Sequence, residues 1–140
     1  EKNANGLISQ RDNNVYIDGR QSSGEWTDTM IGVDALSEQI RVNVFSLYVN
    51  SNKVPYTDEG ASLQIAETQS ALDQFTRNGY LASNLDDDGN ILPAYDAPTA
   101  LAVSEVPANQ RAQRVGPTIT FTARISGAIH YSTINGTLIV

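Results

Sequence analysis

The 140-residue sequence contains no cysteine, which excludes a disulfide framework, a thiolate metal site and a thiol nucleophile. It also lacks a phosphate-binding glycine loop and the HExxH and GxSxG motifs of zinc-dependent and serine hydrolases. Basic residues are scarce: 9 stand against 16 acidic ones, and the net charge of −7 disfavours general binding to nucleic acid or anionic membranes. No apolar run approaches the roughly 18 residues that a membrane-spanning helix needs. We therefore expect a domain that neither binds nucleic acid directly nor inserts into a membrane.

The length and the 40% apolar content fit one domain with one hydrophobic core. Residues 1–13 are rich in Asn, Gly, Gln and charge, which predicts an N-terminal arm or linker before a core domain at 14–140. Within the core domain, Val15–Ile17 has the composition of a short strand, closed by an Asp-Gly turn. The segment 26–30 is expected to form a second short strand.

Two long helices follow. Apolar residues spaced by three or four positions predict the first helix over 31–51, and the width of the apolar stripe suggests burial on more than one side: Val33, Leu36, Ile40, Val44 and Leu47, with Val42, Phe45 and Val49 beside them. Pro55 cannot continue this helix. Thr57 is a suitable N-cap for a second helix over 58–78, and Gly79 suits the position just past its end. Ile40, Val44, Ile65 and Leu72 are the expected core residues.

The remaining chain predicts a small β-sheet. The stretch 83–90 is expected to be a loop, 100–106 an edge strand between prolines, and 108–114 a single helical turn. Alternation of apolar residues with threonine and arginine predicts a strand over 118–125, with a turn at Ser126-Gly127 after it. The fold class is therefore α+β, with two long antiparallel-type helices packed on a small, mainly antiparallel sheet.

Two candidate chemical sites fail on their own spacing. His130 is the only histidine and has no serine or aspartate motif beside it, so a structural role is favoured. The segment 84–91 matches part of a calcium loop, but the twelfth position, which needs a bidentate glutamate, is Tyr95. An acidic turn explains the same letters. We expect no catalytic residue, no cofactor and no metal site.

Charge is distributed unevenly along the chain. Residues 51–100 carry a net charge of −6, whereas 101–140 carry +2. Arg111, Arg114 and Arg124 form a basic group without the aromatic residues that nucleic-acid binding would use, so salt bridges are favoured. The imbalance fits either solvated faces or complementary contacts between copies of the protein.

Three blocks of sequence resemble the contractile tail sheath proteins of bacteriophages. Glu25-Trp26-Thr27-Asp28 followed by Ile31-Gly32-Val33-Asp34-Ala35-Leu36 is similar to the entry into the first helix of that family. Lys53-Val54-Pro55-Tyr56-Thr57-Asp58-Glu59-Gly60 resembles its link between two helices. Gln110-Arg111-Ala112-Gln113-Arg114, with Thr118 to His130, is similar to its closing segment. The resemblance covers roughly residues 14–140 and rests on the order and spacing of the three blocks.

The resemblance implies a structural protein rather than an enzyme. Such sheath subunits form hexameric rings stacked around a tail tube, and the sheath contracts to drive the tube through the host envelope. Members of the family are several hundred residues long, so this chain would correspond to a C-terminal core domain or to an unusually compact subunit. The implied location is the virion tail, assembled in the host cytoplasm, and the implied partners are other copies of the subunit and the tail tube protein.

Contacts between sheath subunits would involve terminal arms that complete a neighbour's sheet. The tail of the chain is apolar, β-prone and free of charge and proline, which makes it a candidate for such exchange. The expected subunit-contact residues are Arg111, Arg114, Arg124, Leu138, Ile139 and Val140. Two alternatives remain open: another phage tail structural or adaptor protein, and a small acidic enzyme or binding module that uses carboxylates.

Overall fold

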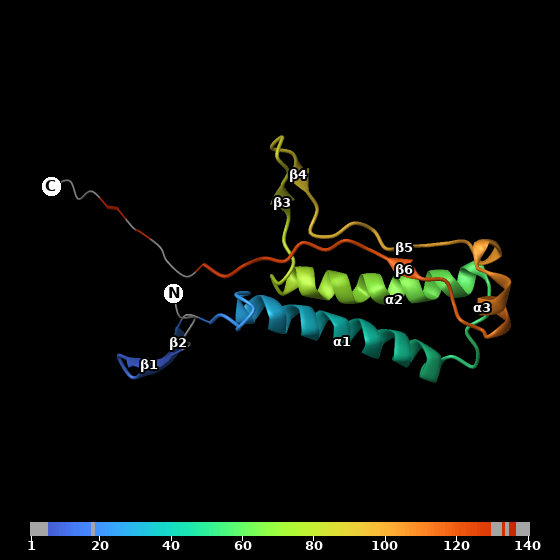
Figure 1. Ribbon diagram of the computed structural model, residues 1–140, viewed down its shortest axis with the longest axis horizontal. Coiled ribbons are helices and arrows are strands. Elements are labelled where there is room, and N and C mark those ends of the chain that lie inside the picture. The colour runs from blue at the N-terminus through green and yellow to red at the C-terminus, as the bar shows by residue number, and fades with distance from the viewer. Residues whose placement is uncertain (1–5, 18, 130–132, 134, 137–140) are drawn as a thin grey trace.

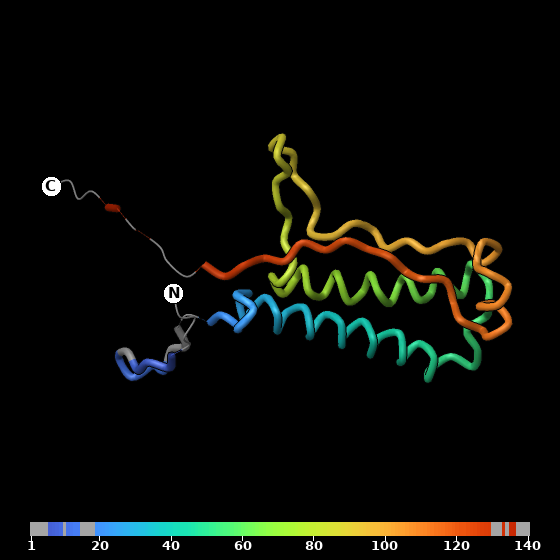
Figure 2. Tube along the Cα trace, in the orientation of Figure 1, coloured from blue at the N-terminus to red at the C-terminus, as the bar shows by residue number. Residues whose placement is uncertain are grey.

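The computed structural model describes residues 6–17, 19–129, 133 and 135–136. Its body is a pair of antiparallel helices, α1 (Thr27–Asn50) and α2 (Asp58–Arg77), with a long two-stranded ribbon lying along α2 (Figure 1). A β-hairpin projects from the N-terminal end of α1, and a second hairpin rises from the ribbon near the C-terminal end of α2. The two strands of the ribbon run along the helix pair in opposite chain directions, as the tube trace shows (Figure 2). The body is therefore long and thin rather than closed around a central core.

Helix α1 begins at Thr27, so the strand expected over 26–30 is wrong. Trp26 is the extended N-cap residue, and its carbonyl accepts the first helical hydrogen bond from the Met30 N–H at 3.1 Å. Residues 27–30 contain no proline or glycine, and Asp28 in the first turn suits the positive end of the helix dipole. These local preferences extend the helix by one turn beyond the apolar stripe.

Helix α2 has the predicted start, and its end at Arg77 lies one residue from the predicted one. The Thr57 hydroxyl accepts from the Gly60 N–H at 3.4 Å, as an N-cap does. The same position favours glycine, because a Cβ built at Gly60 would lie 1.9 Å from the Pro55 carbonyl oxygen. Gly79 follows the helix with φ of +78°, which glycine adopts without strain. The link between the helices is therefore closed by close backbone packing.

The first hairpin pairs β1 (Gly6–Gln10) with β2 (Asn13–Ile17), in a register that places Ile8 opposite Val15. The short strand expected at Val15–Ile17 is thus confirmed as part of β2. Its partner strand falls within the stretch expected as an extended arm. Its described part, Gly6–Gln10, is extended, but it pairs with β2 through the turn at Arg11 and Asp12, both of which have positive φ.

The ribbon pairs the chain after α2 with the chain after the short helix α3 (Ala108–Ala112). Strand β5 (Thr99–Ala100) pairs antiparallel with β6 (Ile119–Thr120), and bridges join Tyr95 to Ala123 and Leu81 to Ile125. Between Leu81 and Tyr95 the chain leaves the ribbon and returns through a hairpin of β3 (Asn84–Leu85) and β4 (Ile91–Leu92). The α+β class is confirmed, with the sheet divided into three two-stranded pieces in the described part of the chain.

The connections at the far end of the ribbon differ from the expected ones. The strand expected over 100–106 is wrong beyond Ala100, because a 3₁₀ turn, η1 (Val103–Glu105), follows. The Val103 N–H in this turn donates to the Asp58 carboxylate on α2 at 2.7 Å. Because this N–H is already bonded to α2, it is not available to pair with a neighbouring strand. The helical turn expected at 108–114 is confirmed as α3 (Ala108–Ala112). The expected turn at Ser126-Gly127 is wrong, because the ribbon pairing extends to Ser126. The Ser126 N–H donates to the Tyr80 carbonyl at 2.8 Å.

The core of the described residues is small. Its main cluster comprises Leu72, Phe75, Leu81 and Ala94, where α2 meets the ribbon. Of the expected core residues, Leu72 is completely buried, whereas Ile40, Val44 and Ile65 are only half-buried. Helix α1 approaches this cluster through Gly32, which packs against the Tyr80 ring. One chain therefore covers one side of α1 and leaves the rest of that helix exposed.

Leu72→Ala should lower the free energy of unfolding by about 2–5 kcal/mol, because it removes buried surface and leaves a cavity in the tightest part of the core. Leu63→Ala on the same helix is the matched control, since Leu63 is 45% exposed, and it should cost much less. Urea denaturation followed by circular dichroism measures both. Equal losses for the two variants would contradict the observed packing of α2.

Candidate subunit interface

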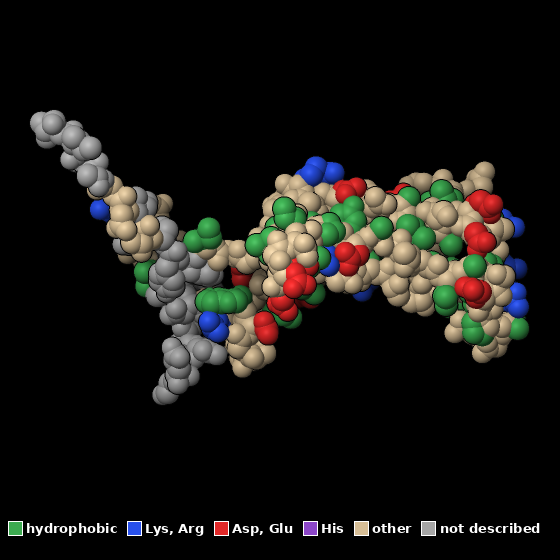
Figure 3. Space-filling model, turned by 90° about the horizontal axis from the view of Figure 1, so that it is seen from above, with side chains coloured by type: hydrophobic (Ala, Val, Ile, Leu, Met, Phe, Trp, Pro, Cys, Tyr) green, Lys and Arg blue, Asp and Glu red, His purple; other side chains and the backbone are tan. Residues whose placement is uncertain are grey.

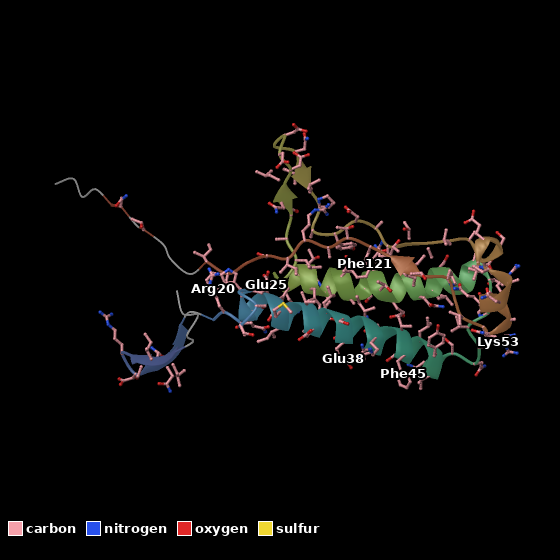
Figure 4. The ribbon with its side chains drawn as sticks, in the orientation of Figure 1. Arg20, Glu25, Glu38, Phe45, Lys53 and Phe121 are labelled. Carbon is pink, nitrogen blue, oxygen red and sulfur yellow. The ribbon has the colours of Figure 1, made fainter. Side chains whose placement is uncertain are left out.

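The outer face of α1 carries apolar side chains without cover in the single chain. Val42, Phe45 and Val49 follow at helical spacing, and Phe45 is 66% exposed; it points away from α2 in Figure 4. The only buried residue of the helix is Gly32. Burial of α1 on more than one side, as its wide stripe suggested, is therefore wrong for the isolated chain. Contiguous exposed apolar surface is typical of protein–protein contact sites.

The ribbon strand at 119–126 has one free edge. On its paired side, Thr122 C=O accepts from the Asp96 N–H at 2.8 Å, and Arg124 donates to the Ala94 carbonyl at 2.8 Å and accepts from the Ala82 N–H at 3.1 Å. Phe121, Ala123 and Ile125 alternate with these residues. Within the described residues, their backbone N–H and C=O groups form no hydrogen bond. Unpaired strand edges recruit further strands.

An apolar groove runs between that strand and α1. Its volume is about 410 Å³, and it is lined by Val33, Leu36, Ser37, Ile40, Phe121, Ala123 and Ile125. Figure 4 shows Phe121 on the ribbon strand, near β6. A free edge beside an apolar groove provides both main-chain bonds and side-chain pockets, the two requirements of strand addition.

A second hollow lies at the opposite end of the body, where the helix link meets the loop after α3. It has a volume of about 490 Å³, and Tyr48, Lys53, Val54, Pro55, Tyr56, Gln64, Arg111, Arg114 and Gly116 line it. We call it the basic pocket, because three of these side chains are cations and none is an acid. The Tyr56 hydroxyl donates to the Val115 carbonyl at 2.6 Å and joins its two walls. Within the described residues, Lys53, Arg111 and Arg114 form no ion pair.

The hairpin of β3 and β4 ends in an acidic tip, residues 86–90. Asp86 braces the tip from within: its carboxylate accepts from the Asn90 backbone N–H at 2.7 Å, the Asn90 side-chain amide at 2.9 Å and the Asp88 N–H at 3.0 Å. Gly89 closes the turn with φ of +83°. Asp87 and Asp88 are left exposed on this frame, and Figure 3 shows the acidic group at the end of the hairpin. In the part of the chain described, no group of acids or histidine is arranged to hold a metal ion.

Arg124 holds the base of the same hairpin. Its guanidinium donates to the Pro93 carbonyl at 2.9 Å and pairs with the Asp96 carboxylate at 3.1 Å. Beside it, the Tyr95 hydroxyl donates to the Asp73 carboxylate on α2. This bond to Asp73, together with burial, raises the pKa of Tyr95 above its ordinary value. The hairpin is therefore anchored both to the ribbon and to the helix below it.

The structure separates the residues expected at subunit contacts. Arg111 and Arg114 meet in the basic pocket, whereas Arg124 is engaged within its own chain. The salt-bridging role expected for the group is thus confirmed for Arg124. Leu138, Ile139, Val140 and the candidate histidine His130 lie outside the described residues. Sequence reasoning missed Lys53 as a third member of the pocket, and its signal was only its place in the link before Pro55.

Comparison with known protein families identifies the domain. The family model described as "E217 tail sheath protein gp31-like, C-terminal domain" matches residues 27–138, which include both helices and the whole ribbon. The chain belongs to this family. A search of curated proteins finds no significant match to the chain. As a tail sheath domain the chain has a structural role in the phage tail, and the resemblance of its three sequence blocks to sheath proteins is confirmed. Among the described residues, no helix combines the length and apolarity needed to cross a bilayer.

The acidic tip has a titration signature. The Asn90 amide, with the backbone N–H groups at Asn90 and Asp88, holds the pKa of Asp86 below its ordinary value of 3.8. The bonds are therefore fully formed at neutral pH and are lost only as the pH falls through that lowered value. Asn90→Ala removes one donor and should raise the pKa of Asp86 part of the way back, as measured by NMR of the side-chain carboxyl carbon. Asn84→Ala, in the same hairpin but without a bond to Asp86, is the control. An identical Asp86 titration in both variants would contradict the bracing of the tip.

Proposed function

We propose that this sheath domain assembles into hexameric rings stacked around a tail tube, and that contraction of the stack drives the tube through the host envelope. The free edge of the strand at 119–126, beside the apolar groove, is the observation that supports assembly by strand addition. A neighbour's arm laid along Phe121, Ala123 and Ile125 would pair their free backbone groups and cover the groove. Contraction takes place in the virion tail, after the tail has been assembled in the host cytoplasm.

The exposed face of α1 supports a second type of contact. Val42, Phe45 and Val49 expose apolar surface to water. Covering that surface with a neighbouring subunit would gain roughly 25 cal/mol of free energy for each Å² removed from water. Compact helical bodies that cover such faces in different ways can exist in two packings. Contraction is then a shift between two arrangements of the same subunits, driven by the better-covered interfaces of the short state. Strand arms keep neighbours connected while the bodies repack.

The contact residues divide between two kinds of interaction. Leu138, Ile139 and Val140 are proposed to pair as a strand with an edge of the neighbouring subunit. Arg111 and Arg114 are proposed to make polar contacts between subunits, because their guanidinium groups form no ion pair with the described residues of their own chain. Arg124 contributes by fixing the hairpin and the ribbon in their observed positions. None of these roles requires a cofactor.

Deletion of Thr137–Val140 should impair assembly more than it reduces helix content, because the segment supplies a pairing strand and lies outside both helices. Electron microscopy of the purified protein measures the formation of rings and tubes, and circular dichroism measures helix content on the same samples. Deletion of residues 1–5 is a control for shortening the chain by a polar segment. Normal tubes formed by the Thr137–Val140 deletion would contradict the strand-exchange mechanism, and loss of all secondary structure would place the segment in the core.

A further inference from the structure

We propose that the acidic tip of one copy docks into the basic pocket of a second copy. The inference rests on the proposed function, since it assumes self-assembly, and it names two surfaces that meet. The tip is residues 86–90 of the hairpin, and the pocket is the hollow lined by Lys53, Arg111 and Arg114. The two surfaces are complementary in charge and shape, and they lie at different ends of the body.

The charges of the two surfaces are opposite and largely uncompensated. Three cations line the pocket without an acid among its residues, and Asp87 and Asp88 extend from the tip without a hydrogen bond from their side chains in the described residues. The acids nearest the pocket along the chain are already engaged. Asp58 accepts from the Val103 N–H, and the Thr57 hydroxyl donates to the Glu59 carboxylate, which lowers the pKa of Glu59; both acids remain charged, but neither lines the pocket. Complementary surfaces of this kind orient partners and suppress wrong ones.

The shapes also correspond. The tip is a narrow projection that stands clear of the body in Figure 1, and the pocket is a hollow. Each is held in place by its own bonds: Asp86 braces the tip, and the Tyr56–Val115 bond closes the pocket wall. Preformed surfaces lose less conformational entropy on association than loose ones.

A copy cannot fill its own pocket. The hairpin rises beyond the C-terminal end of α2, whereas the pocket lies at the N-terminal end, beside the link and α3 (Figure 1). A helix of 20 residues is about 30 Å long, so the two surfaces lie at least that order of distance apart. Figure 4 shows Lys53 at the far end of the body from the hairpin. The acidic tip must therefore reach a different copy.

Contacts between two different surfaces propagate. Tip-to-pocket docking is heterologous, so it leaves a free pocket on one copy and a free tip on the other, and such contacts build rings or helical arrays. The contact is ionic and exposed, so it weakens with salt and is modest in each copy. A repeated, individually weak contact suits a lattice whose connected subunits repack against one another during contraction.

The test reverses the charges on each side separately. The tip variant carries Asp87→Lys and Asp88→Lys, with Asp86 kept because it braces the loop. The pocket variant carries Arg111→Glu and Arg114→Glu. Because net charge alone alters association, the controls carry equal changes at exposed positions outside the proposed contact surfaces: Asp12→Lys with Glu25→Lys, and Arg11→Glu with Arg77→Glu. Sedimentation velocity of the whole chain measures self-association at two ionic strengths, about 0.01 M and about 1 M. The Debye length is about 30 Å at the first and about 3 Å at the second.

We expect wild-type association at low salt to weaken at high salt. Each reversed variant alone should associate about tenfold or more weakly than its control. An equal mixture of the two variants should regain association, because the lysine tip meets the glutamate pocket and the remaining aspartate tip meets the arginine pocket. Two misfolded variants would not restore each other, so recovery in the mixture supports the docking.

Three results would overturn the docking: a wild-type chain that stays monomeric at low salt, reversed variants that associate as their controls do, or a mixture that fails to recover. A fourth result would assign a different occupant: co-sedimentation of a monomeric wild-type chain with purified tail tube protein, lost in the pocket variant. Electron microscopy of the same samples separates this failure from that of the proposed function. Tubes formed by variants that associate normally would leave the sheath role intact while removing the docking.

Discussion

The packing of Leu72 and Phe75 on α2 against Leu81 and Ala94 is the contact on which the body depends. It joins the helix pair to the ribbon, and the remaining interactions branch from it. Two segments pair with the strand at 119–126, one before the hairpin of β3 and β4 and one after it. Leu81 lies in the first segment and Ala94 in the second. Without this cluster the ribbon would lose the buried side chains through which it packs on α2.

A body organised around so small a cluster leaves much of its apolar surface uncovered. The outer face of α1, the groove beside Phe121 and the free edge of the ribbon strand are all consequences of a thin, two-layer shape. In a protein that acts alone these features would favour aggregation. In a tail sheath domain they are the surfaces that neighbouring subunits can cover. The side chains that stabilise the single chain are therefore a different set from those that remain exposed for contact with neighbours.

Polar groups divide into those that hold the chain and those that remain available. Arg124, Asp96, Tyr95 and Asp73 hold the base of the hairpin through bonds within one chain. Arg111, Arg114 and Lys53 face solvent at the other end. The uneven charge along the sequence thus becomes a separation of charge in space, with an acidic projection at one end and a basic hollow at the other. The alternative of solvated faces and that of contacts between copies lead to different responses to salt.

The sequence by itself determined the two helices, the link between them and the structural family. Helical periodicity, the Thr57 cap and Pro55 are local features, since each acts within a few residues, and they located α2 within one residue at each end. Only the tertiary structure decided which apolar residues are buried and how the end of the chain is paired. Ile40, Phe45 and Leu72 are all apolar residues within helical segments, so the sequence does not distinguish their burial. Leu72 is buried where the ribbon packs on α2, Ile40 is half-buried, and Phe45 is exposed on a face of α1 that the ribbon does not cover. Likewise Lys53, Arg111 and Arg114 form one pocket because the chain returns past α3 to the link, a long-range contact that no local pattern encodes.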